Sequence, residues 1–251
     1  MTQHELQLEF AKLLEQIGTI IDEDLMDVEP TFNDKEVISY IFFIRAAEIF
    51  KAISILLSTD VDQVVPAKML LRSLSEYYIL LKSSIEDESF NARHLKHAGR
   101  EKEKWLEKTL KHHAASGFKQ DPKYFEEMKE EIRQFHEEYE SNLQTAYQLF
   151  EDRKELPLYL HVYAPASMYV HGNRQSFDVY YNPGGGVKQT PDRDYSPLLR
   201  HTGLATGQIM LQSYEQFCKV LKHETAAIKR IEGLLETSAA TIQKSMPSGY
   251  R

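Results

Sequence analysis

The most informative segment of this chain is Pro66-Ala-Lys-Met-Leu-Leu-Arg72-Ser-Leu-Ser-Glu76-Tyr-Tyr-Ile-Leu-Leu81. At 100° per residue its apolar side chains fall on nearly every side of a helix, and a helix of that kind is usually buried. Arg72 and Glu76 stand four residues apart within this apolar surface, so they share one face. The segment therefore predicts a core helix that carries an ion pair, with a helical bundle packed around it.

Other segments repeat apolar residues at helical spacing. They cover 3–25, 35–58, a helix that starts at Ser196-Pro197, and 226–244. The segment 35–58 is the most apolar, yet it contains Arg45, Glu48 and Lys51. A membrane span needs about 20 apolar residues with few charges, so the sequence favours a buried core helix.

Two of these helices follow each other directly, which sets their expected packing. Helices joined by a short loop usually pack antiparallel. The segments 35–58 and 66–86 are joined in this way. We therefore expect Arg45 and Glu48 to lie at the same level of the core as Arg72 and Glu76.

A helical hairpin is predicted over 90–151. Gly117 is a helix terminator, and Asp121-Pro122 is a typical start for a second arm. The first arm is rich in Lys and Arg, and the second is rich in Asp and Glu. Complementary charges of this kind suit an antiparallel pair of helices.

The later part of the chain contains one polar helix and one long loop. Tyr163, Ser167 and His171 are spaced four apart and so point roughly the same way on a helix. Residues 172–197 follow as the one long non-helical stretch, with strand confined to about 174–190. We expect a single helical domain over 1–245 and a frayed tail over 246–251.

Composition limits the function. The 251 residues carry a formal net charge of −8, which does not favour nucleic acid as a partner. The N-terminus lacks the pattern of a signal peptide, so a cytoplasmic location with no membrane association is expected. No cofactor is expected, because Val187 stands where a phosphate-binding loop ending at Lys188 would need glycine.

Metal and nucleophile patterns are also lacking. The single cysteine, Cys218, excludes a disulfide framework, and it sits in an apolar run that favours a core position over a nucleophile. None of the ten histidines has a Glu three residues before it, as a di-iron bundle would require. We therefore predict no metal site.

The candidate site collects the polar residues that fall on apolar helices. Buried charges are costly unless they are paired, so they are kept for binding, for chemistry or for fixing helix register. A purely structural network remains an alternative to a binding site. The candidate binding residues are Arg45, Glu48, Arg72, Glu76, Tyr163, Ser167 and His171.

The helix with Leu71-Arg72-Ser-Leu-Ser-Glu76, followed far downstream by Tyr163-x-x-x-Ser167-x-x-x-His171-Gly172, resembles an uncharacterised, mostly bacterial helical family. That family is classified only as a domain of unknown function. The resemblance implies an all-helical fold and a shared polar site over roughly 35–220, and it implies no activity.

The arrangement also resembles HEPN domains, which are helical bundles of bacterial toxins and phage-defence proteins. Their nuclease motif is an Arg followed by a His after four to six intervening residues. This chain departs from that motif, because no Arg has a His at that spacing, and Arg93 and His97 are separated by three residues.

Two functions follow as hypotheses. The first is a non-catalytic binding or interaction module in bacterial defence or stress response, with a small anionic ligand or a protein as partner, including a second copy of the chain. The alternative is a HEPN-like hydrolase or nuclease with His171 as general base, Arg72 binding an anion and Glu76 orienting one of them. The first is favoured because no complete catalytic motif is present, and whether the protein is an enzyme stays open.

Overall fold

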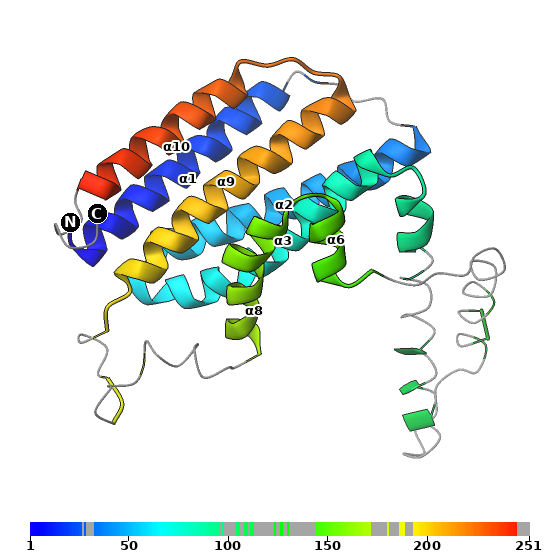
Figure 1. The fold of residues 1–251 in the computed structure, drawn as a ribbon, viewed down its shortest axis with the longest axis horizontal. Coiled ribbons are helices and arrows are strands. Elements are labelled where there is room, and N and C mark those ends of the chain that lie inside the picture. The colour runs from blue at the N-terminus through cyan, green and yellow to red at the C-terminus, as the bar shows by residue number, and fades with distance from the viewer. Residues whose placement is uncertain are drawn as a thin grey trace. The chain divides into compact units, whose positions relative to one another are not determined.

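In the computed structural model the described residues are 1–26, 28, 33–95, 97, 104–105, 108–109, 111–112, 123, 126–127, 130, 144–171, 180, 186–188 and 193–244. Their elements are helices, which confirms the predicted all-α class, and these helices alone make up more than half of the chain (Figure 1). Within those ranges no β-strand occurs. Val187 makes one isolated bridge, and the neighbouring Lys188 N–H donates to the Tyr180 carbonyl at 2.7 Å. This pairing lies inside the range predicted for strand.

The chain divides into two compact units, Met1–Ile85 with Ala146–Arg251, and Glu86–Thr145. In the second unit a helix begins at Phe90, just after Asp87 accepts hydrogen bonds from the N–H and the hydroxyl of Ser89. Most of the hairpin predicted over 90–151, most of the loop predicted over 172–197, and the tail 246–251 lie outside the described residues. The single domain predicted over 1–245 stays a prediction.

The first helix, α1 (Gln3–Leu25), begins at a capping box. The Thr2 hydroxyl accepts from the Glu5 N–H at 3.2 Å, and the Glu5 carboxylate accepts from the Thr2 N–H at 2.7 Å. Two N–H groups that the helix cannot satisfy itself are thereby bonded. The apolar face predicted from the spacing is buried, and it consists of Leu6, Phe10, Leu13, Leu14, Ile17, Ile20 and Ile21.

α1 packs parallel to α9 (Ser196–Leu221), as Figure 1 shows. At the start of both helices, the side-chain oxygen of Gln3 accepts from the Tyr195 N–H at 2.6 Å. At their far ends, the Tyr214 hydroxyl donates to the Asp24 carboxylate. The starts of α1 and α9 therefore lie together, as do their far ends, although Asp24 and Tyr214 are 190 residues apart in the chain.

Two glycines of α9, Gly203 and Gly207, allow its neighbours to come close. A Cβ added at Gly203 would lie 2.2 Å from the ring of Phe10 on α1. One added at Gly207 would lie 2.8 Å from Leu235 of α10 (Ala227–Lys244) and 3.1 Å from Ile17 of α1. Three helices therefore meet along one stripe of α9.

The predicted antiparallel pair is formed by α2 (Asp34–Thr59) and α3 (Val64–Glu86), joined through the short η1 (Val61–Gln63). Ser39, near the start of α2, shares a 2.7 Å hydroxyl–hydroxyl hydrogen bond with Ser84, near the end of α3. Phe43 of α2 stacks on Phe217 of α9, with ring centroids 4.0 Å apart. The pair is thus fixed to the rest of the bundle by aromatic packing.

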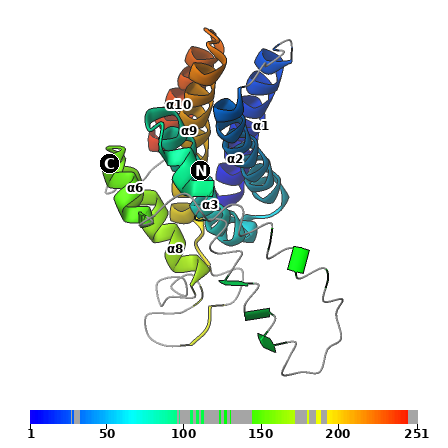
Figure 2. The ribbon, with the colours of Figure 1, turned by 90° about the vertical axis from the view of Figure 1, so that its right-hand side faces the viewer.

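A short helical arm lies along one flank of α3 (Figures 1 and 2). It consists of α6 (Ala146–Asp152), α7 (Leu156–Leu158), a π-helical turn η2 (Tyr159–Tyr163) and α8 (Ala164–Val170). Phe150 and Tyr163 pack on Ile79 of α3 in a buried cluster. The last three elements run without a break, with Pro165 in the first turn of α8.

None of the helices in the described ranges is long and apolar enough to cross a membrane. In α2, the most apolar segment, Phe42, Phe43, Ala46, Phe50, Ile53 and Leu57 are buried. The core-helix prediction for 35–58 is therefore confirmed for that face of α2.

Candidate functional site

The arm that flanks α3 meets a row of polar residues. Lys68, Arg72 and Glu76 recur every fourth position, so they form one stripe along α3. Arg72 and Glu76 face η2 and α8, and Lys68 extends to α9. The surface around the stripe is apolar and offers few hydrogen-bond partners. Its polar groups therefore bond one another and polar groups of the neighbouring helices.

Arg72 is the centre of the site. Its Nη2 donates to Glu76 Oε1 at 2.8 Å and to the Tyr163 hydroxyl at 3.1 Å. Its Nε donates to Ser167 Oγ at 3.1 Å. The Tyr163 hydroxyl in turn donates to Glu76 Oε1 at 2.9 Å, which closes a triangle of hydrogen bonds. The guanidinium also lies 5.3 Å from the centroid of the Tyr163 ring, within cation–π range.

Exposure differs across the cluster. Tyr163 is 7% exposed, whereas the side chains of Arg72 and Glu76 are 26% and 34% exposed. The ion pair is therefore half-buried. The sequence predicted a pair enclosed in the core, but the arm covers α3 on one side only. Burial, and next the hydrogen bond to Glu76, raise the pKa of Tyr163, so its phenol stays protonated and able to donate.

The remaining candidates lie apart from this cluster. Arg45 and Glu48 bond each other at 2.8 Å on α2, with side chains 58% and 57% exposed, so their predicted place in the core is wrong. They lie on the same outer face of α2 as the exposed Ile41 and Ile55. His171 is also exposed, because α8 ends at Val170 and His171 is its C-cap. Its side chain makes no hydrogen bond to any described residue, Glu76 included.

Sequence reasoning missed the shortest contact of the stripe. Lys68 is 2% exposed, and its Nζ lies 2.6 Å from Nδ1 of His201 on α9. His201 Nε2 lies 2.7 Å from the carbonyl oxygen of His161 in η2. The signal for Lys68 was its four-residue spacing from Arg72, but no local pattern connects either residue with His201.

Pro165 helps to explain why the His161 carbonyl is available to His201. Proline has no N–H, so Pro165 cannot donate to the carbonyl of His161, four residues before it. That carbonyl instead accepts from His201. A side chain from a distant helix thus bonds a backbone group within the π-helical turn.

A second polar contact fixes the arm between α6 and α7. Glu155 Oε1 accepts from the Tyr78 hydroxyl and from Lys82 Nζ, both at 2.6 Å. The Lys82 and Glu155 side chains are 15% and 17% exposed. Together with Arg72, these bonds hold the arm against α3 at two levels.

Another polar cluster joins the far ends of α1 and α9. Asp24 accepts from Tyr214, from Thr225 and from His223 Nε2, the last at 2.8 Å. Burial acts to raise the pKa of Asp24, but these hydrogen bonds outweigh it and the pKa is lowered. Burial raises the pKa of the nearby Cys218 thiol to about 11. Cys218 is buried, as expected of a core residue.

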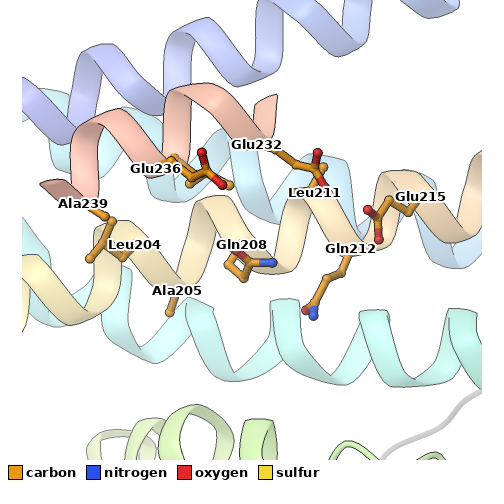
Figure 3. Close-up of a pocket in the computed structure, with 10 residues that line it drawn as sticks. Leu204, Ala205, Gln208, Leu211, Gln212, Glu215, Glu232, Glu236 and Ala239 are labelled. Atoms are coloured by element: carbon orange, nitrogen blue, oxygen red, sulfur yellow. The ribbon is translucent and has the colours of Figure 1, made fainter. Parts of the chain in front are cut away.

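A groove of about 620 Å³ runs between α9 and α10 (Figure 3). Glu215, Glu232 and Glu236 line it, and Gln212 points away from them toward α3. Burial, and next the charge of Glu232, raise the pKa of Glu215. Among the residues searched, which are those that the structure describes, no group of three His, Cys, Asp or Glu could hold a metal ion.

Comparison with known proteins gives one match. The model of a family described as a family of unknown function (DUF5677) matches residues 36–186, which is more than half of the chain. The matched segment contains Lys68, Arg72, Glu76, Tyr163 and Ser167, but not His201. No curated protein and no solved structure matches.

Proposed function

The chain belongs to the DUF5677 family of unknown function, and we propose that it is a cytoplasmic binding module for a small anionic ligand, with Arg72 as the anchoring residue. The observation that carries the proposal is the orientation of Arg72. Two of its three nitrogens are bonded to protein groups, and Nη1 has no hydrogen-bond partner among the described residues.

A guanidinium held in this way is prepared for an anion. Its planar fork suits carboxylate or phosphate groups. Because Ser167, Tyr163 and Glu76 already fix the side chain, little further conformational freedom is lost on binding. The side chain is 26% exposed, so the fixed group is also accessible to solvent.

The neighbouring groups add donors. Ser167 Oγ accepts from Arg72 Nε, which leaves its own proton to donate to a ligand. Oε1 of Glu76 already accepts from Arg72 and from the Tyr163 hydroxyl. The cluster therefore offers a ligand the Nη1 group of Arg72 and the hydroxyl of Ser167 as donors.

The hydrolase or nuclease alternative has less support. It needs His171 beside Glu76 or Arg72 so that a general base is positioned. His171 is exposed, and its side chain is hydrogen-bonded to neither residue. The cluster around Arg72 therefore lacks a positioned general base.

Sulfate is a suitable first probe, because its charge does not change near neutral pH. Thermal unfolding would be followed in sodium sulfate, with sodium chloride at equal ionic strength as reference. We expect sulfate to raise the unfolding midpoint of the wild type, and Arg72→Gln to abolish that rise.

Arg45→Gln is the matched control, because Arg45 forms an Arg–Glu pair of the same 2.8 Å length on α2. It should keep the full response to sulfate. Ser167→Ala, which removes one donor, should weaken the response even if Arg72→Gln folds poorly. An equal response in the wild type and both site variants, or no response in the wild type, would refute the proposal.

A further inference from the structure

We infer that Lys68 is the second cation of the same anion site, and that it takes up a proton when an anion binds beside Arg72. This inference rests on the proposed function and specifies it further. It names a proton-coupled site that prefers anions of higher charge, such as sulfate or a phosphate ester, over monocarboxylates.

The hydrogen bonds of His201 set the state of Lys68. A carbonyl oxygen can only accept, so His201 Nε2 must carry the proton that bonds His161. Nδ1 then presents a lone pair, and it accepts from the Lys68 amine at 2.6 Å. His201 is thereby held as a neutral acceptor that orients the lysine.

Among the residues that the structure describes, none supplies a counter-charge to Lys68. It is 2% exposed, and His201 Nδ1 is the only acceptor that the described residues give to its amine. A buried ammonium without an anionic partner is costly, and burial lowers the pKa of Lys68 to about 7. Burial, and next the charge of Lys68, also lower the pKa of His201. The Lys68 amine therefore titrates near neutral pH, while the lowered pKa of His201 favours its neutral form.

The position of Lys68 connects it with Arg72. The two residues are four apart on α3, where side chains start about 5–6 Å from each other. Charges on neighbouring turns of a helix interact, so a negative charge bound to Arg72 is expected to stabilise the charged form of the Lys68 amine, and Lys68 would then take up a proton. Among the described residues, the titratable group in contact with Lys68 is His201 on α9. Arg72 follows one turn along α3 and is itself bonded to Glu76. From η2 the contact to His201 is a neutral carbonyl, and His161 is exposed.

Calorimetric titration of the intact protein with sulfate tests the inference. At pH 7.5, in two buffers of different ionisation heat, we expect wild-type binding to take up a substantial fraction of a proton. Affinity should fall by about tenfold or more from pH 6.5 to 9, because the amine becomes harder to protonate. Monocarboxylate, with acetate as probe, should bind more weakly than sulfate.

Two variants separate the charge of Lys68 from its proton uptake. Lys68→Met should weaken sulfate binding and remove both the proton uptake and the pH dependence. Lys68→Arg, which stays charged at these pH values, should bind sulfate without proton uptake. His201→Asn changes the acceptor and should shift the pH dependence while the Arg72 contacts remain.

The outcomes distinguish this inference from the proposed function. If sulfate binds Lys68→Met with wild-type affinity and proton uptake, and Arg72→Gln abolishes binding, the role of Lys68 is refuted and the anion site stands. If sulfate does not bind the wild type, both fail. A wild type that binds sulfate without proton uptake also refutes the inference.

Discussion

Tyr163 and Arg72 are separated by 91 residues in the chain, yet the Tyr163 hydroxyl accepts from Arg72 Nη2 at 3.1 Å and donates to Glu76 at 2.9 Å. This one hydroxyl connects the arm formed by α6 to α8 with both members of the α3 ion pair. A group that donates and accepts within one triangle couples the energies of its partners.

The triangle predicts non-additive stability. Glu76→Gln and Tyr163→Phe should each destabilise the protein, and their double-mutant coupling should be about 1 kcal/mol, because the pair is half-exposed. Chemical denaturation of the four proteins measures it. His171→Ala combined with Glu76→Gln is the control and should be additive, since His171 lies outside the triangle. Additive effects for Glu76 and Tyr163 would contradict the shared network.

Lys68 predicts a dependence of stability on alkaline pH. Burial lowers its pKa from 10.5 to about 7, so between these values the unfolded chain binds a proton that the folded protein has released. The free energy of unfolding should therefore rise with pH in this window, relative to Lys68→Met, by up to about 1.4 kcal/mol per pH unit.

The difference between wild type and Lys68→Met is the quantity to measure, by urea denaturation from pH 6 to 10. Titrating groups that do not interact with Lys68, such as Cys218, contribute equally to both proteins and cancel. The free energy of unfolding of Lys68→Met should exceed that of the wild type by the largest amount below pH 7. A difference that does not change with pH would mean that Lys68 keeps an ordinary pKa.

Asp24 predicts that stability also rises with pH, here in the acid range. Its pKa is lowered in the folded protein, so its stabilisation is complete above the unfolded pKa and is lost as pH falls through the folded value. Asp24→Asn should cost about 2–3 kcal/mol at pH 7, because Tyr214, Thr225 and His223 lose a charged acceptor. In thermal unfolding, the difference in midpoint between the wild type and Asp24→Asn should become smaller toward pH 3. A difference that stays constant with pH would exclude this role of Asp24.

The glycines predict an order of stability. Gly203→Ala should be the most harmful, at about 3 kcal/mol or more, because its Cβ would overlap the buried ring of Phe10. Gly207→Ala should cost less, since the atoms in contact are the ends of Leu235 and Ile17. Gly233→Ala meets nothing within 4 Å and should stabilise α10 by about 0.5–1 kcal/mol. Thermal unfolding measures the order, and equal unfolding midpoints for the three variants would contradict the close packing of α9 against α1 and α10.

The part of the site that sequence could predict follows from local spacing. Arg72 and Glu76 share a helix face by their spacing, and Tyr163 and Ser167 share another, so two polar stripes on apolar helices were expected to meet. His171 extends the second stripe only if the helix continues, and α8 ends one residue earlier. The spacing predicts a shared face only for residues within one helix, and His171 is already the C-cap of α8.

The remaining errors have other physical causes. Arg45 and Glu48 were placed in the core because α2 is apolar on most sides, but its outer face exposes Ile41 and Ile55 as well. The contact of Lys68 with His201 depends on which face α9 turns toward α3. Nothing local to either residue encodes that orientation.

The parallel pairing of α1 and α9 has a consequence for protein synthesis. Asp24 is made about 190 residues before Tyr214, so α1 leaves the ribosome roughly 10–40 s before its main partner exists. During that time its buried face, with Phe10 and Ile17, has no α9 to cover it. Contacts so distant in sequence slow folding and lengthen exposure to aggregation. The nascent chain should therefore be a chaperone client until α9 has been translated.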